Sequence, residues 1–231
     1  MTYHNVIPGT FIHRPNRFIA EVEINGRQET VHVKNTGRCR ELLIPGSRVY
    51  LEASDNPNRK TAYDLIAVEK ERPGASPLLI NMDSQAPNHA VGEWLPKSGL
   101  FLGNALIRRE VTYGSSRFDF CIDDNHTRSF LEVKGVTLEQ NGLALFPDAP
   151  TERGVKHLHE LIHCIRHGYS AYVLFVVQMK GIHRFSPNDS THRAFGDALR
   201  LASQAGVTLL ARDCITTADS MTIDAPIPIE L

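Results

Sequence analysis

Two neighbouring segments in the middle of the chain alternate between apolar and polar residues, and this pattern constrains the fold more than any other. They are residues 116–122 and 130–135. A period of two indicates a strand with one face in the core. The residues between them, 123–128, are mostly turn formers. We therefore expect an antiparallel hairpin.

The alternation assigns each residue of the hairpin to a face. Phe118, Phe120 and Ile122 fall on one face of the first strand, and Arg117, Asp119 and Cys121 fall on the other. If the hairpin is symmetric about Asn125 and His126, position i lies opposite position 251 − i. Asp119 then faces Glu132, and Arg117 faces Lys134. A slip of one residue would separate the two carboxylates.

Two facing carboxylates need a cation between them. Directly opposed residues have Cβ atoms roughly 4.5–5.5 Å apart, and like charges placed so are destabilising. Mg²⁺ is bound through one or two carboxylates together with water and phosphate oxygens. With Lys134 on the same face, the set could hydrolyse a phosphodiester, because the metal neutralises phosphate charge and activates water. An ordinary exposed hairpin with charges of both signs also accounts for the pattern.

Composition limits the class of protein without choosing one. The 231 residues are enough for one large domain or two small ones, and 42% of them are apolar. The formal net charge is −1, so the whole chain does not have the charge of a nucleic-acid binder. Any basic surface must therefore be local.

The cysteines and the hydropathy indicate a cytoplasmic protein. The four cysteines are far apart and show no C-x-x-C spacing, which favours reduced thiols over a disulfide framework or a zinc site. The N-terminus has no apolar signal region, and no run approaches 18 apolar residues. We expect no association with a membrane.

The first part of the chain predicts an OB-like barrel of five short strands. Strand patterns cover residues 18–24, 29–33, 48–52 and 62–69, and Asn25-Gly26 is a strong hairpin signal. A helical turn is expected near residues 38–43. This order suits a small closed barrel in residues 1–75, with a linker near residues 72–77.

The remainder, residues 76–231, predicts a mixed α/β sheet with helices on both faces. Asn88 can cap a short helix that ends before Pro96. Further helices are expected at residues 152–167 and 191–204. Strands are expected at residues 106–113, 117–122, 129–134, 143–146, 172–178 and 207–211.

Several strings of residues resemble the bacterial sugar fermentation stimulation protein A family. The most specific is F-P-D-A-P-T-E-R-G-V-K-H-L at residues 146–158, and the hairpin, residues 18–22, residues 35–38 and residues 184–187 agree with it. The resemblance covers essentially the whole chain. It implies an OB-fold followed by a restriction-endonuclease-like α/β/α domain with a central mixed sheet. It also implies DNA binding and a link to the regulation of sugar metabolism.

The resemblance assigns roles to individual residues. Asp119, Glu132 and Lys134 match the PD-(D/E)xK motif of such nucleases, although Phe118 stands where the motif has proline. It implies Mg²⁺ or Mn²⁺ bound by Asp119 and Glu132 with the Val133 carbonyl. Glu93 matches a position where these nucleases often place another acid, and a solvated helix residue is the alternative.

Seven residues are candidates for contacts with DNA or RNA. Arg153 and Lys156 open the helix after Thr151, where helix N–H groups can receive a phosphate. Their alternative is an ordinary first turn capped by Thr151 or Asp148. OB barrels bind single strands in basic grooves with aromatic platforms. The remaining candidates are Arg117 in the hairpin and Arg17, Asn35, Thr36 and Arg38 in the barrel.

The sequence also allows two alternatives to a nuclease, a zinc metalloprotease and a DNA-binding regulator. Residues 159–163 read H-E-x-x-H, the signature of zinc metalloproteases, but Tyr169 stands where a third histidine ligand would be. A nuclease is therefore favoured. Its main alternative is a DNA-binding regulator of sugar (maltose) metabolism whose nuclease site is vestigial.

Overall fold

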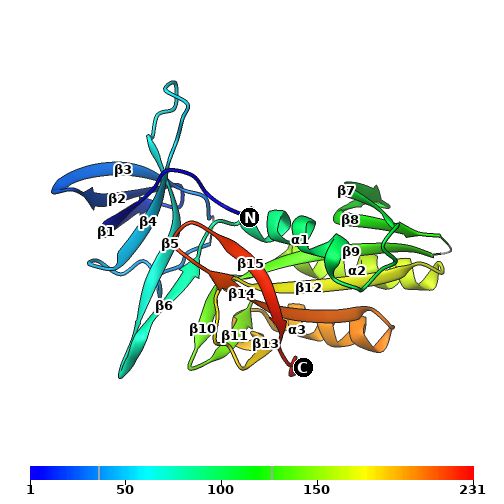
Figure 1. The fold of residues 1–231 in the computed structure, drawn as a ribbon. Coiled ribbons are helices and arrows are strands. Elements are labelled where there is room, and N and C mark those ends of the chain that lie inside the picture. The colour runs from blue at the N-terminus through cyan, green and yellow to red at the C-terminus, as the bar shows by residue number, and fades with distance from the viewer. Residues whose placement is uncertain (36, 126) are drawn as a thin grey trace.

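The computed structural model describes residues 1–35, 37–125 and 127–231. Figure 1 shows a β-barrel built from the first third of the chain beside a larger sheet with helices packed on it. No helix within the described ranges is long and apolar enough to span a lipid bilayer. All four cysteines are buried, and none forms a disulfide.

The predicted five-stranded OB barrel is confirmed. Its strands hydrogen-bond in the order β3-β2-β1-β4-β5, and a short parallel pairing of β3 with β5 closes the barrel. The Asn25-Gly26 turn has positive φ at both residues, as a tight hairpin requires. The predicted helical turn is a single hydrogen-bonded turn from Cys39 to Leu43. The strands are β1 (Val6–Asn16), β2 (Ile19–Ile24), β3 (Arg27–Val33), β4 (Arg48–Ala53) and β5 (Tyr63–Arg72).

A sixth strand, β6 (Ala75–Asn81), pairs with β5 and carries the barrel sheet toward the second part of the chain. The division after residue 75 stays a prediction. Polar contacts join the two parts. Gln178 Nε2 donates to the carbonyls of Asn81 and Asp83, and Ser84 Oγ donates to the carbonyl of Lys34. The barrel is thereby fixed relative to the larger sheet.

The second part is built on a mixed sheet, as expected, and this sheet has six strands in the described ranges. The order is β15-β14-β12-β9-β8-β7, with β12 parallel to both β9 and β14 and the other pairs antiparallel. A small sheet, β10-β11-β13, lies at its end. The strands of the large sheet are β7 (Leu106–Tyr113), β8 (Ser116–Asp124), β9 (Thr127–Val136), β12 (Ser170–Val177), β14 (Thr208–Thr216) and β15 (Met221–Pro226); those of the small one are β10 (Leu138–Gln140), β11 (Leu143–Phe146) and β13 (Arg184–Pro187).

Helices cover both faces of the large sheet (Figure 1). The helix α1 (Ala86–Trp94) packs on one face, and a 3₁₀ turn (Leu95–Lys97) follows it. The helices α2 (Glu152–Arg166) and α3 (Asp189–Gln204) pack on the other face and against each other. Thr151 caps α2, because its Oγ1 accepts the N–H of Gly154.

The predicted register of the hairpin is confirmed, but the predicted face of one residue is wrong. The β8–β9 pairs run from Asp124 opposite Thr127 to Phe120 opposite Leu131 and end there. Phe120 and Ile122 pack with α1, whereas Phe118 packs on the α2 side, 6.0 Å from the ring of His157. The alternation therefore breaks at Asp119.

Candidate active site and nucleic-acid interface

The break at Asp119 brings a carboxylate into the plane of the sheet. Asp119 Oδ2 accepts the N–H of Val133 at 2.7 Å, where a regular ladder would use a backbone carbonyl. Its Oδ1 accepts from Asn88 Nδ2 at 2.7 Å. Burial raises the pKa of Asp119, and the nearby charge of Glu132 raises it further. The two hydrogen bonds and the charge of Lys134 lower the pKa of Asp119, but the net shift is upward.

Glu132 lies beside it on β9 and is 4% exposed. Its Oε1 is a shared acceptor, bound by Lys134 Nζ at 2.6 Å and by His157 Nδ1. Burial by itself would raise the pKa of Glu132, but these contacts outweigh it and hold the pKa below the ordinary value. Its Oε2 is buried and has no hydrogen-bond partner among the residues that the structure describes. The carboxylate of Glu132 is thus held in its charged form, with Oε2 available to bind a further group.

These residues fit a hard divalent cation. An unpartnered buried carboxylate oxygen is costly unless something binds it, and Mg²⁺ needs only one or two carboxylates from the protein. Within the described ranges, no three histidine, cysteine or acidic side chains gather to hold a metal. The rest of the coordination shell would therefore come from water, substrate oxygens and the Val133 carbonyl, whose role stays a prediction.

The structure does not bring Glu93 to this pair. Its carboxylate is exposed and bonds the amino group of Met1 at 2.7 Å. Asn88, which the sequence places at the start of α1 as a cap, lies inside the helix and contacts Asp119 instead. Glu93 comes five positions after Asn88. In a helix of 3.6 residues per turn, the two side chains therefore point about 140° apart around the axis. The two side chains therefore leave α1 in different directions.

A cavity of about 570 Å³ opens beside Asp119. It is lined by Asn88 and by Arg109, whose guanidinium donates to the Asn88 carbonyl at 2.6 Å and lies over the ring of Phe120. No sequence pattern singles out Arg109. Nothing in its own segment marks it, because only the packing of β7 against α1 places it beside the acid.

The basic residues of the hairpin and of α2 already contact other groups of the protein. Arg117 is exposed and lies 3.6 Å from Glu110. Arg153 Nε donates to His157 Nε2 at 3.3 Å, and Lys156 Nζ donates to the Ser115 carbonyl at 2.7 Å. Their contacts with nucleic acid stay predictions.

The H-E-x-x-H residues serve another purpose. Glu160 accepts the hydroxyl of Ser115 at 2.7 Å, and His163 pairs with the hydroxyl of Tyr113 at 2.9 Å. These contacts tie α2 to the turn between β7 and β8. They account for Glu160 and His163 without a zinc ion.

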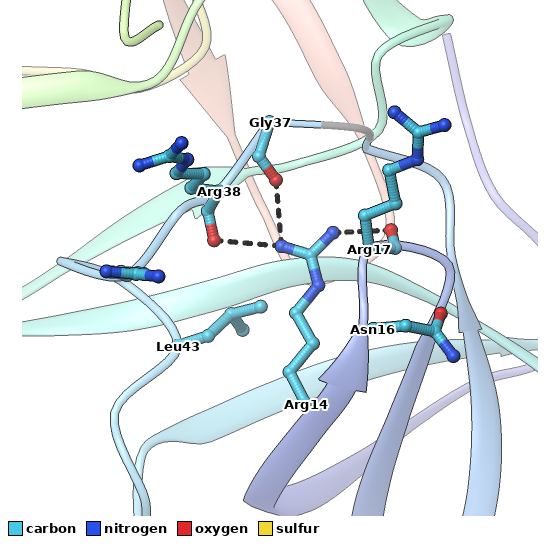
Figure 2. A pocket seen from close by; sticks show the side chains of 7 residues that line it. Arg14, Asn16, Arg17, Gly37, Arg38 and Leu43 are labelled. Carbon is cyan, nitrogen blue, oxygen red and sulfur yellow. Dashed lines mark hydrogen bonds between the residues drawn. The ribbon is translucent and has the colours of Figure 1, made fainter.

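A second cavity, of about 400 Å³, lies in the barrel and is rich in arginine. Arg14 organises it. Its guanidinium donates to the carbonyls of Gly37, Arg38 and Arg17 (Figure 2) and to that of Asn35. The side chains of Arg17 and Arg38 extend on either side of it (Figure 2). In the part of the chain that the structure describes, no carboxylate forms an ion pair with Arg17, Arg38 or Arg40, which also lines the cavity.

A third cavity, of about 370 Å³, shares lining residues with both of these cavities. It shares Gly37 with the arginine cavity and Ser84 with the cavity beside Asp119. Asn35 lies at this junction, where its side chain accepts the Gly37 N–H and donates to the Met82 carbonyl. Thr36 lies outside the described residues. The three cavities therefore adjoin one another at Gly37 and Ser84, between the barrel arginines and Asp119.

A closed five-stranded barrel joined to a mixed sheet with a paired aspartate and glutamate defines a class of two-domain protein, with an OB domain followed by a restriction-endonuclease-like domain. Family models agree with both parts. Residues 12–76 match the SfsA N-terminal OB domain, and residues 85–220 match the sugar fermentation stimulation protein RE domain. The chain belongs to the sugar fermentation stimulation protein family.

Similar proteins cover the chain almost entirely. A sugar fermentation stimulation protein homolog of Desulfitobacterium hafniense is 57% identical over 96% of this chain and 94% of its own length. That of Clostridium beijerinckii is 54% identical over 96% of both chains, and that of Ruminiclostridium cellulolyticum is 52% identical over 100% of both. A solved structure of Pyrococcus furiosus SfsA in complex with Ca²⁺ has a TM-score of 0.88 at 28% identity, and it covers 100% of this chain and 98% of the other.

Proposed function

We propose that this protein is a Mg²⁺- or Mn²⁺-dependent nuclease that hydrolyses phosphodiester bonds in nucleic acid. One observation carries the proposal. Glu132 is held charged in the core, and its Oε2 has no partner in the described ranges. It lies next to Asp119, whose pKa is raised by burial and by the charge of Glu132. A divalent cation relieves both conditions at once.

Each residue has a role that follows from its contacts. Asp119 and Glu132 supply oxygen ligands for the cation, and Asn88 holds Asp119 in place through its amide. The bound metal ion would neutralise phosphate charge and lower the pKa of a water molecule. Lys134, bonded to Glu132, adds a positive charge and a proton donor for the phosphate or for the attacking water.

The barrel arginines supply the binding surface in this proposal. Three guanidinium groups without acidic partners in the described chain match the charge of a phosphate backbone. The adjoining cavities at Gly37 and Ser84 would direct a bound strand toward Asp119. Contacts from Arg117, Arg153 and Lys156 would hold the strand near the cleavage point.

The comparisons support the metal. The Pyrococcus furiosus relative was solved with Ca²⁺, which binds oxygen ligands as Mg²⁺ does but with looser geometry. A protein that only binds DNA would gain affinity from losing carboxylates beside a phosphate. Their presence here, with Lys134 in place, favours catalysis over a vestigial site.

The test is a cleavage assay on single- and double-stranded DNA and RNA with Mg²⁺ or Mn²⁺. We expect wild-type protein to cut at least one substrate, and Asp119→Ala and Lys134→Ala to lose about 10²–10⁴-fold in rate. The control is Glu93→Ala, which removes an acid of the same domain whose carboxylate accepts from the amino group of Met1. This variant should cut as wild type does. If wild type cuts nothing with either metal, the proposal fails. It also fails if Asp119→Ala and Lys134→Ala cut as well as wild type. Salt-dependent DNA binding without cleavage would support the regulator instead.

A further inference from the structure

His157 is a buried side chain between two residues of the candidate active site. It lies on α2 and is 4% exposed. Its Nδ1 contacts Glu132 Oε1, and its Nε2 lies 3.3 Å from Arg153 Nε. The edge-on ring of Phe118 packs 6.0 Å away. The imidazole is thus held by contacts on both of its nitrogens and by packing.

These contacts determine which nitrogen carries the proton. A guanidinium has donors and no acceptor. Arg153 must therefore donate, so His157 Nε2 accepts and carries no hydrogen. The hydrogen of the ring is then on Nδ1, and it is donated to Glu132 Oε1. Arg153 selects the tautomer that binds the carboxylate.

We propose that His157 is a positioning residue for the metal ligand Glu132, with its tautomer set by Arg153. The inference rests on the proposed nuclease site. With His157 and Lys134 both donating to Oε1, the carboxylate cannot turn that oxygen away, and Oε2 is the atom left for the cation. Partners of this kind, one step removed from the metal, typically change metal affinity by about 10–100-fold.

The test measures metal binding directly, by the electron paramagnetic resonance signal of free Mn²⁺ titrated with protein. His157→Leu removes the donor, and we expect Mn²⁺ affinity to fall about 10–100-fold. His157→Asn places an amide nitrogen near the position of Nδ1, and we expect it to restore most of the affinity. A merely structural histidine would not separate these two variants in metal affinity at equal thermal stability.

Arg153→Met provides a second test that leaves the core untouched, because Arg153 is exposed. It removes the tautomer selection, and we expect a loss of several-fold in Mn²⁺ affinity. The matched control is His32→Leu, which removes a histidine that bonds the buried carboxylate of Asp64 in the barrel at 2.9 Å. It should leave Mn²⁺ affinity unchanged.

The outcomes separate this inference from the nuclease proposal. If folded His157→Leu binds Mn²⁺ as tightly as wild type, His157 does not position Glu132, whether or not the protein cuts nucleic acid. If His157→Leu does not fold, His157→Asn and Arg153→Met decide, and wild-type affinity in Arg153→Met refutes the tautomer selection. A wild-type protein that binds Mn²⁺ with this dependence on residue 157 but cuts nothing refutes the nuclease alone.

Discussion

Replacing Lys134 by methionine tests whether the buried charges of the site act as a unit. Methionine keeps an unbranched side chain that is one atom shorter, and it removes the charge. In the native protein Nζ donates to Glu132 Oε1 at 2.6 Å, and the lysine and glutamate side chains are only 14% and 5% exposed. Glu132 would keep its contact with His157. The variant therefore weakens the support of the carboxylate without abolishing it.

The expected cost follows from these contacts. A hydrogen bond to a charged group contributes about 1.5–3 kcal/mol, and the remaining histidine contact places the loss in Lys134→Met near 2 kcal/mol. In a chain of 231 residues, a loss of that size lowers the melting temperature by about 4–8 °C. Catalysis, if Lys134 acts on water or phosphate, should fall by about 10²–10⁴-fold.

The stability loss should also depend on pH with a defined sign. The pKa of Glu132 is held below its ordinary value of 4.5, so its interactions stabilise the fold above that value and are lost as the pH falls through the lowered pKa. Lys134→Met removes one of the groups that hold this pKa down. The difference in free energy of unfolding between wild type and variant should be full near pH 7 and shrink below about pH 4.5.

Urea and thermal unfolding between pH 3 and pH 7 measure this difference, and the cleavage assay runs in parallel. The control is Lys180→Met, which removes a half-exposed lysine bonded to the buried carboxylate of Asp213 in the same domain. It should lower stability by no more than Lys134→Met and leave cleavage unchanged. Equal stability of Lys134→Met and wild type at neutral pH would refute the assignment of a buried charged unit.

Three further predictions concern binding, metal and packing. Arg38→Ala should weaken single-stranded DNA binding and reduce the slope of log affinity against log salt by about 0.7, one phosphate contact, in a fluorescence anisotropy titration. Mn²⁺ affinity should begin to fall at a higher pH than an ordinary aspartate would give, because the pKa of Asp119 is raised; calorimetry that shows a flat affinity from pH 4 to pH 7 would contradict this. Gly135→Ala places a Cβ 2.5 Å from Gln178 Oε1 and should cost about 1–3 kcal/mol in urea unfolding, whereas Gly103→Ala, with no atom within 4 Å, should cost less.

Local sequence patterns determined most of the architecture. The turn at Asn25-Gly26 and the alternation of residues located four of the five barrel strands, because backbone preferences and a half-buried face act within a few residues. The charged hairpin was readable in the same way, and its register is the predicted one. The short strands β10, β13 and β15 and the barrel strands β1 and β6 were missed, since their patterns are weak without their partners.

The site was only partly readable. Asp119, Glu132 and Lys134 form a motif that one hairpin carries, so the sequence alone was enough to propose them. Tertiary packing decided which groups support them. Asn88 and His157 lie 31 and 25 residues from the acids that they bind, and neither belongs to the hairpin.

Tertiary packing also decided how Asp119 and Glu132 lie relative to each other and which group Glu93 contacts. The alternation of β8 breaks at Asp119 because its carboxylate takes the Val133 N–H, a contact that no periodicity predicts. Glu93 lies on the right helix, but that helix directs it to the N-terminus of the chain. The sequence by itself determined which strands form and which acids they carry, because those depend on neighbours along the chain. The tertiary structure decided which side chains meet, because hydrogen bonds between distant segments form only after the sheet and helices have packed.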